Sequence, residues 1–195
     1  MIKYIEFPFC PVCRYPSVNG ITHPRCFSGL TLDGVFTAAH YNGPVKKSIR
    51  LAKYSFVSDL LPELTQILFE KFPAYLQDFD FLIPVPLHFS RGKSRGFNQA
   101  NIIAKIINSM TGIPMMKDNL YRRTNTKPQF GLKPKERAQN IKNVFYLKNS
   151  VEITGKKICL VDDVATTFST LNECAKILKK NGAVRVWAIV LAHGN

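Results

Sequence analysis

The sequence has 195 residues, of which 27 are Lys or Arg and 13 are Asp or Glu, so its formal net charge is +14. This length fits one domain with a hydrophobic core, and a hydrophobic content of 46% excludes a disordered chain. No apolar run approaches the roughly 20 residues of a membrane-spanning helix, and no secretory signal is visible. We therefore expect a cytoplasmic protein without membrane insertion. The basic excess favours a polyanionic partner: nucleic acid, a phosphorylated small molecule or an acidic membrane surface. Solvated lysines are the alternative.

The N-terminal stretch is rich in Cys and Pro, and we expect it to form a separate element over residues 1–30. It contains Cys10-Pro-Val-Cys13 followed by His23-Pro-Arg-Cys26. This pair-plus-pair spacing suits a closed tetrahedral zinc site, and bound Zn²⁺ would let a segment too short for its own core fold. We expect Cys10, Cys13 and Cys26 to be ligands, with His23 as one candidate for the fourth. Reduced thiols in a loop are the alternative.

The rest of the chain, residues 31–195, is predicted to form an α/β domain. Its apolar strands alternate with helices, which is typical of a parallel sheet covered on both faces. Hydrophobic periodicity and Gly stops give the bounds. In chain order we expect a strand at 35–41, helices at 46–53 and 59–72, a strand at 80–85, a helix at 99–111, a strand at 156–161, a helix at 169–181 and a strand at 184–191.

Two adjacent carboxylates, Asp162 and Asp163, follow the predicted strand at 156–161, and a turn rich in hydroxyl residues then opens a helix. Ligands bind at this edge of open α/β sheets. A helix N-terminus offers N–H groups to a phosphate, and two carboxylates can accept hydrogen bonds from the hydroxyls of a ribose. The pattern therefore predicts a ribose 5-phosphate site. An ordinary capped turn is the alternative.

Two basic stretches, residues 85–105 and 117–142, together carry ten of the fourteen net positive charges. Both contain predicted loops, and guanidinium groups bind phosphate oxygens well, so we expect them to contact pyrophosphate or another anion. A solvated surface loop is the alternative for the second. The expected contacts are Leu87, His88, Arg91, Arg95, Arg123 and Arg137. Interleaved aromatic residues would be either stacking platforms for single-stranded DNA or core residues; these are Phe89, Phe97, Tyr121 and Phe130.

The segment after the strand at 156–161 resembles the phosphoribosyl pyrophosphate (PRPP) signature of type I phosphoribosyltransferases. The resemblance implies that Asp162 and Asp163 hold ribose, and that PRPP binds with Mg²⁺. It also implies a phosphate-binding loop made of Ala165, Thr166, Thr167, Phe168, Ser169 and Thr170. Phe168 stands where the signature has Gly. If that position requires a positive φ, Phe has a conformational cost there.

Nearly the whole chain resembles the ComF family, whose members are associated with DNA uptake in natural competence. Besides the Cys pairs and the acidic signature, the matching motifs are Tyr41-Asn-Gly-Pro-Val-Lys46, Lys53-Tyr, Pro84-Val-Pro-Leu-His with Arg95-Gly-Phe-Asn-Gln, and Thr126, Gln129 and Leu132 with Arg137, Asn140 and Phe145. The resemblance implies a type I phosphoribosyltransferase-like parallel sheet flanked by helices, behind a zinc-binding element.

Two functions remain open from the sequence. One is a competence protein that binds PRPP or a 5′-phosphorylated nucleotide and holds single-stranded DNA on its basic loops. The other is a PRPP-dependent transferase with an unknown acceptor. The family also suggests a third reading, a scaffold for a competence helicase or a recombination mediator.

Overall fold

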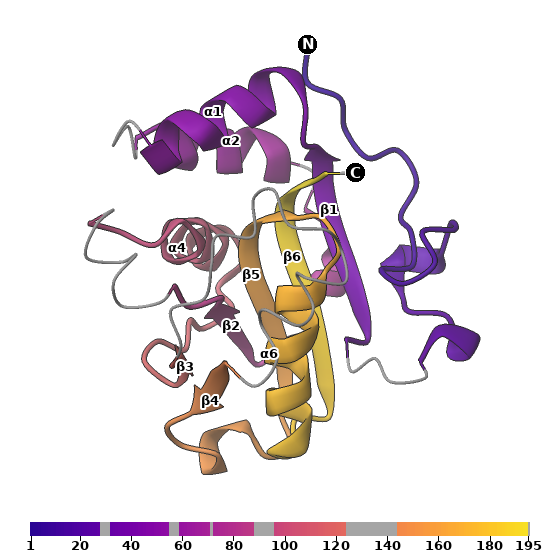
Figure 1. The fold of residues 1–195 in the computed structure, drawn as a ribbon, viewed down its shortest axis with the longest axis vertical. Coiled ribbons are helices and arrows are strands. Elements are labelled where there is room, and N and C mark those ends of the chain that lie inside the picture. The colour runs from indigo at the N-terminus through magenta and orange to yellow at the C-terminus, as the bar shows by residue number, and fades with distance from the viewer. Residues whose placement is uncertain (28–31, 55–58, 71, 88–95, 124–143, 195) are drawn as a thin grey trace.

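The computed structural model describes residues 1–27, 32–54, 59–70, 72–87, 96–123 and 144–194 (Figure 1). Its centre is a sheet of four parallel strands in the order β1-β6-β5-β2. The strands are β1 (Gly34–His40), β2 (Phe81–Pro84), β5 (Lys157–Ala165) and β6 (Arg185–His193). Because all four run the same way, their carboxyl ends meet at one edge, where ligands bind in such sheets.

Helices cover both faces of the sheet (Figure 1). One face carries α1 (Gly43–Tyr54), α2 (Leu60–Phe69) and α4 (Gln99–Thr111), and the other carries α6 (Ser169–Lys180). Beside α6 lies a short antiparallel pair, β3 (Leu120–Arg122) and β4 (Phe145–Leu147). Within the described parts of the chain, no helix combines the length and apolar character needed to cross a membrane.

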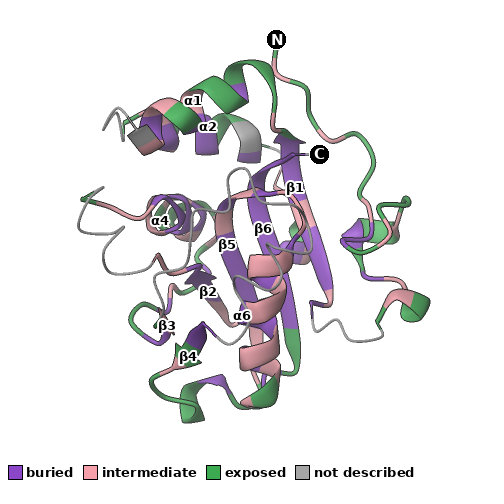
Figure 2. Ribbon diagram, viewed as in Figure 1, coloured by how far each residue is buried: buried purple, intermediate pink, exposed green. Residues whose placement is uncertain are grey.

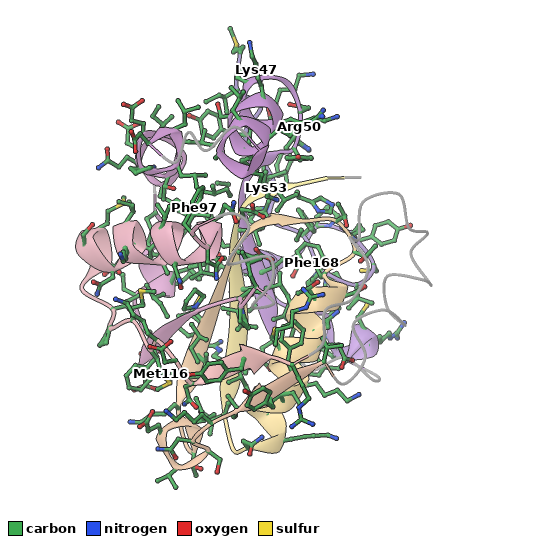
Figure 3. All side chains as sticks on the ribbon, turned by 60° about the vertical axis from the view of Figure 1, so that its left-hand side comes forward. Lys47, Arg50, Lys53, Phe97, Met116 and Phe168 are labelled. Carbon is green, nitrogen blue, oxygen red and sulfur yellow. The ribbon has the colours of Figure 1, made fainter. Side chains whose placement is uncertain are left out.

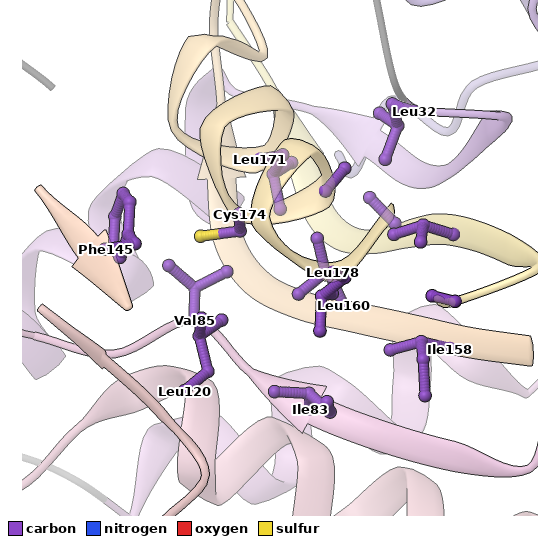
Figure 4. Close-up of a cluster of buried hydrophobic side chains, with 14 of the residues drawn as sticks. Leu32, Ile83, Val85, Leu120, Phe145, Ile158, Leu160, Leu171, Cys174 and Leu178 are labelled. Carbon is purple, nitrogen blue, oxygen red and sulfur yellow. The ribbon is translucent and has the colours of Figure 1, made fainter. Parts of the chain in front are cut away.

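Two apolar clusters hold these layers together, and they are separated by the alternation of side chains along the central strands. Ile158 and Leu160 of β5 pack toward α6. Cys159 and Val161 belong to the cluster under α1 and α4. The central strands are accordingly buried along most of their length (Figure 2). Figure 4 shows the first cluster, in which Leu171, Cys174 and Leu178 of α6 lie over Ile83, Ile158 and Leu160.

The N-terminal segment is attached to the free side of β1. The amide of Ile5 donates to the carbonyl of Ala38 at 3.0 Å, and the amide of His40 donates to the carbonyl of Lys3 at 2.9 Å. Further along, Gly20 has a φ of 80°, and a Cβ there would collide with the carbonyl oxygen of Val35. Glycine is therefore required at this close approach. The expected boundary near residue 30 falls on residues outside the described ranges.

The expected parallel sheet with flanking helices is confirmed, and α4 has the predicted bounds. The Asn98 side chain accepts a hydrogen bond from the Ala100 amide at the start of α4, and Gly112 ends it at a φ of 74°. The end of β5 was predicted wrongly. The strand continues four residues past the expected end, to Ala165, because β6 still pairs with it there. The pair β3–β4 was not predicted, since strands of three residues show no periodicity.

Candidate functional site

The two signature carboxylates lie inside β5, near its carboxyl end, and face opposite sides of the sheet, as adjacent residues of a strand do. Asp163 is 5% exposed and lies on the α1 side. Its Oδ2 is 2.7 Å from the Nζ of Lys53, near the end of α1. In Figure 3, Lys47, Arg50 and Lys53 follow one another along α1, and Lys53 is the one beside the strand ends. Asp163 is therefore neutralised by a cation from a neighbouring layer.

Asp162 lies on the α6 side and is partly accessible. Its Oδ1 accepts a hydrogen bond from the backbone amide of Asp163 at 2.8 Å. Burial and the neighbouring Asp163 carboxylate raise the pKa of Asp162 to about 7, against the opposing effects of Lys53 and of Arg122 on β3. Asp162 is therefore only partly ionised near neutral pH. In its ionised form it can accept hydrogen bonds from a ligand.

Residues 165–170, which we call the 165–170 loop, lead from β5 into the first turn of α6. Phe168 occupies the N-cap position with a φ of 55° and a ψ of 8°. The left-handed conformation expected at the usual Gly position is therefore present with a Phe side chain. The hydroxyls of Thr167 and Ser169 are 2.7 Å apart. Asp162 comes seven residues before α6 begins, on the face of the sheet that α6 covers, and Cys174 of α6 is within electrostatic range of its carboxyl group. The signature implies that the N–H groups of the first turn of α6 and this carboxylate serve one ligand.

The Phe168 side chain explains how a bulky residue is accommodated there. It is 2% exposed, and its ring stacks on the His193 ring at a centroid distance of 5.3 Å and an angle of 16°. Phe9 of the N-terminal element lies 6.2 Å from the same ring. Burial of an aromatic side chain outweighs the roughly 1 kcal/mol that a left-handed backbone costs.

Arg14 also reaches the loop. Its guanidinium donates to the Thr166 carbonyl at 2.7 Å and to Nε2 of His193 at 2.6 Å. Nδ1 of His193 is 2.9 Å from the Ala165 carbonyl. Because Arg only donates, Nε2 accepts and Nδ1–H donates. Burial, together with the charge of Arg14, lowers the pKa of His193 to about 4, so the ring is neutral at pH 7.

The four expected metal ligands converge. The ligand atoms of Cys10, Cys13, His23 and Cys26 all lie within 4.8 Å of one another. Nε2 of His23 is 3.2 Å from the Pro16 carbonyl. This contact leaves Nδ1, 3.3 Å from the Cys13 sulfur, free to bind an ion, and such an outer hydrogen bond is usual for metal-binding His. A Cys₃His set suits tetrahedral Zn²⁺, so the cluster could hold a metal ion with His23 as the fourth ligand.

The expected anion contacts are only partly described. His88, Arg91, Arg95 and Arg137 lie outside the described residues, as do Phe89 and Phe130. Leu87 is partly exposed after β2. Arg123 directly follows β3 and is exposed, and its guanidinium lies 5.2 Å from the centre of the Tyr146 ring.

The two described aromatic candidates differ in role. Tyr121 stacks on Tyr146 at a centroid distance of 5.4 Å and an angle of 20°, and the Tyr146 side chain is exposed. Phe97 packs against the cluster under α1 and α4, and so it belongs with the core residues. Tyr121 and Tyr146 are therefore available to stack on a base, and Phe97 is not.

A cavity of about 1090 Å³ lies between the N-terminal segment and the 165–170 loop. Its wall includes Tyr4, Phe7, Arg14, Thr166, Thr167 and His193. The cavity thus adjoins the loop on the side that carries Arg14, and neither signature carboxylate lines it. It is open to solvent and offers space for a second group beside the loop.

Sequence reasoning assigned no role to Lys53, Arg14, Arg122 or His193. Lys53 was visible as part of a family motif, and Arg14 directly follows an expected metal ligand. Their contacts join residues more than one hundred positions apart in the chain. No local pattern could have indicated these pairs.

Comparison with known proteins decides the family. The chain is 31% identical over 193 residues to the DNA utilization protein YhgH of Escherichia coli, a match that covers 92% of this chain and 82% of that protein. The chain belongs to the ComF family. Competence protein ComFC of Bacillus subtilis, 28% identical, is matched over 93% of this chain and 75% of its own length.

A third relative of this ComF-family chain is Competence protein F of Haemophilus influenzae. It is 41% identical over 114 residues, which cover 57% of this chain, and this match spans half the length of that protein. No family model matches the chain.

Solved structures similar to this ComF-family chain include two enzymes. One is a glutamine PRPP amidotransferase from Bacillus subtilis, at a TM-score of 0.45 and 18% identity, covering 67% of this chain and 25% of that one. The other is a purine phosphoribosyltransferase from Pyrococcus horikoshii, at a TM-score of 0.40 and 19% identity. This match covers 68% of this chain and 73% of that one.

Proposed function

We propose that this protein binds the 5′-phosphate of PRPP or of a phosphorylated nucleotide at the 165–170 loop and acts in DNA uptake. The observation that carries the proposal is that β5, which holds Asp162 on its α6 side, leads through a short turn directly into the first turn of α6. The N–H groups of that turn suit a phosphate, and the Asp162 carboxylate suits a sugar hydroxyl. Asp163 would contribute once a ligand competes for its contact with Lys53.

Mg²⁺ would bind together with PRPP, since it prefers substrate phosphate oxygens with few protein ligands. Asp162 and Asp163 would help to hold the ion, and its charge would reduce the repulsion between the ligand's oxygens and these two carboxylates. The chain's own part is to orient the sugar with Asp162 and the phosphate with the loop.

Single-stranded DNA is the proposed macromolecular ligand. The relatives named for competence and DNA utilization support this, as does the net charge of +14. Among the described residues, Lys47 and Arg50 are exposed on α1 and lead toward the site (Figure 3). Such cations would follow a phosphate backbone and bring a strand end to the loop.

A PRPP-dependent transferase is the second candidate, because the cavity of about 1090 Å³ beside the loop could admit an acceptor. The transferase would release pyrophosphate from PRPP when the acceptor binds C1 of the ribose. The binding protein would hold PRPP or a 5′-phosphate without turnover.

Calorimetry with ribose 5-phosphate, and with PRPP plus Mg²⁺, tests the proposal. We expect both ligands to bind wild-type protein and Asp162→Asn to bind PRPP at least about tenfold more weakly. Asp118→Asn is the matched control, since Asp118 is exposed and belongs to neither β5 nor the loop. Absence of heat with both ligands for wild-type protein would refute phosphate binding. Pyrophosphate release with any of a panel of acceptors would favour the transferase.

Fluorescence anisotropy with a 5′-phosphorylated oligonucleotide tests the DNA ligand. We expect the logarithm of the association constant to fall linearly with the logarithm of salt concentration, because binding releases counterions. An oligonucleotide with a 5′-hydroxyl should bind more weakly if its end occupies the loop. A flat salt dependence would show that the basic surface does not bind DNA.

A further inference from the structure

Arg14 connects the Cys/His cluster to the 165–170 loop. We propose that Arg14 is a positioning residue that couples metal binding at the cluster to phosphate binding at the loop, so that each ligand strengthens the binding of the other. The inference rests on the proposed function, since it concerns the affinity of the same loop for a 5′-phosphate.

One end of this connection is fixed by the cluster. Arg14 directly follows Cys13, and its amide donates to the carbonyl of Cys10 at 3.0 Å. Its backbone has a φ of 67°, a left-handed conformation that is uncommon for residues other than Gly. Such a conformation persists only where its surroundings hold it in place. A metal ion bound by Cys10 and Cys13, which both precede Arg14, would hold this turn, and without the ion the turn would be free to relax.

The other end fixes the direction of loop donors. Arg14 donates to the Thr166 carbonyl at 2.7 Å, and His193, itself held by Arg14 at 2.6 Å, donates to the Ala165 carbonyl at 2.9 Å. Because a trans peptide is planar, a fixed carbonyl directs the next N–H to the opposite side. The N–H group of Thr167 is thereby directed away from Arg14, and that of Thr166 away from the His193 ring. These are two of the backbone donors that a phosphate on the loop would use.

Phe168 completes the connection. The Arg14 guanidinium carbon lies 4.9 Å from the centre of the Phe168 ring, and the ring's stacking partner is His193. A cation over an aromatic face is attractive, more so when it is shielded from water. Arg14 therefore contacts the loop through one hydrogen bond to Thr166 and the Phe168 ring face, and indirectly through its hydrogen bond to His193. We expect loss of its position to loosen residues 165–168 together.

The proposed coupling can be expressed as one factor by which each ligand changes the affinity for the other. If bound metal raises the affinity for a phosphate by some factor, then bound phosphate must raise the affinity for the metal by the same factor. A merely structural role of the metal, with the loop equally well ordered in both states, would give a factor of one. We expect a factor of about ten, within the usual range for coupled sites.

The coupling is tested by comparing the protein with and without bound Zn²⁺. The affinity for ribose 5-phosphate is measured by calorimetry for zinc-loaded protein and for protein stripped with a chelator. Zinc affinity is measured against a chromophoric chelator, with and without saturating ribose 5-phosphate. Hydrogen exchange of the loop amides provides a readout that needs no ligand, and we expect it to be slower in the zinc-loaded protein.

Arg14→Ala removes the contacts of Arg14 with the loop and keeps the four residues of the Cys/His cluster. We expect this variant to bind one zinc, and to bind ribose 5-phosphate about tenfold more weakly than wild type, with a coupling factor near one. Arg14→Lys should lie in between, since an ammonium cannot match the planar fork of Arg. Arg25→Ala is the matched control, because Arg25 is exposed and also adjoins a cluster residue, Cys26. It should keep the wild-type factor.

The outcomes separate the two proposals. Binding of ribose 5-phosphate with equal affinity by zinc-loaded wild type and Arg14→Ala would overturn the coupling and leave phosphate binding intact. This comparison needs no zinc-free protein, and so it stands even if stripping unfolds the chain. Failure of wild type to bind ribose 5-phosphate or PRPP in any metal state would overturn both.

Discussion

The ammonium group of Lys53 lies 2.7 Å from the Asp163 carboxylate and joins the end of α1 to β5. Both side chains are largely buried, with exposed fractions of 20% and 8%. A buried ion pair adds little beyond a well-packed apolar pair, but removing one partner leaves a charge without compensation.

Lys53→Met should therefore be strongly destabilising at pH 8. We expect the free energy of unfolding to fall by about 3 kcal/mol, measured by urea denaturation. Lys47→Met is the control, because Lys47 is exposed on the same helix, and it should change the value by less than about 0.5 kcal/mol. Equal losses for the two variants would contradict the assigned contact.

The raised pKa of Asp162 predicts a pH dependence of stability. Between pH 4 and pH 7 the folded protein keeps a proton that the unfolded chain releases, because burial and Asp163 raise the folded pKa from 3.8 to about 7. The folded state then binds more protons, so the contribution of this group to stability is present at acidic pH and is lost as pH rises toward 7. Asp162→Asn does not titrate and should lack this loss.

Urea denaturation at pH 5 and pH 8 measures this effect. From pH 5 to pH 8, we expect the free energy of unfolding of wild type to fall relative to that of Asp162→Asn, by on the order of 2 kcal/mol. Asp118→Asn, at an exposed site, serves as the control. A difference between Asp162→Asn and wild type that stays constant with pH would contradict the raised pKa.

Phe168→Gly places the usual signature residue at the N-cap of α6. The change removes a backbone cost of about 1 kcal/mol. It also deletes a buried ring that contacts His193, Phe9 and Arg14, which costs about 3 to 5 kcal/mol. Packing is the larger effect, so we expect a net loss of about 2 to 4 kcal/mol in thermal or urea unfolding.

Phe168→Ala provides the comparison for Phe168→Gly. Alanine also loses the ring but keeps the cost of a positive φ, so it should be less stable than the glycine variant by about 1 kcal/mol. A glycine variant more stable than wild type would show that backbone strain exceeds the packing of the ring.

The Cys/His cluster predicts one Zn²⁺ per chain after purification without chelator, measured by atomic emission. His23→Ala should weaken zinc binding about tenfold or more, because it removes one of four ligands and its outer hydrogen bond to the Pro16 carbonyl. His40→Ala, outside the cluster, should leave zinc affinity unchanged. Full zinc affinity in His23→Ala would mean that another group completes the site.

Local sequence signals predicted most of the fold. α4 followed from an apolar stripe and a stop at Gly112, both of which act within one helix, and the structure adds the cap at Asn98. The metal cluster and the acidic signature were likewise visible, because their residues are close together in the sequence. The end of β5 was missed because two acidic residues do not look like a strand interior. Its pairing with β6, seen at Asp162 opposite Val190, determines where it ends.

Contacts between distant residues could not be predicted in this way. Arg14 and Thr166 are 152 positions apart, and Lys53 and Asp163 come from different layers. A positive φ at Phe168 was considered as one case, because the signature has Gly there, but the partners of the ring were not predicted. Those partners lie on the N-terminal element and at the end of β6, and only the folded chain brings them together.

The attachment of residues 3–5 to β1 also bears on self-association. β1 is the last strand of the parallel sheet on that side, and the bridge between Tyr4 and Ala39 occupies part of its outer edge. An uncovered edge strand offers unpaired N–H and C=O groups to another chain. The segment that covers this edge continues into the Cys/His cluster, which begins five residues later, at Cys10. We therefore expect damage to the cluster to weaken the cover of the β1 edge and to favour aggregation.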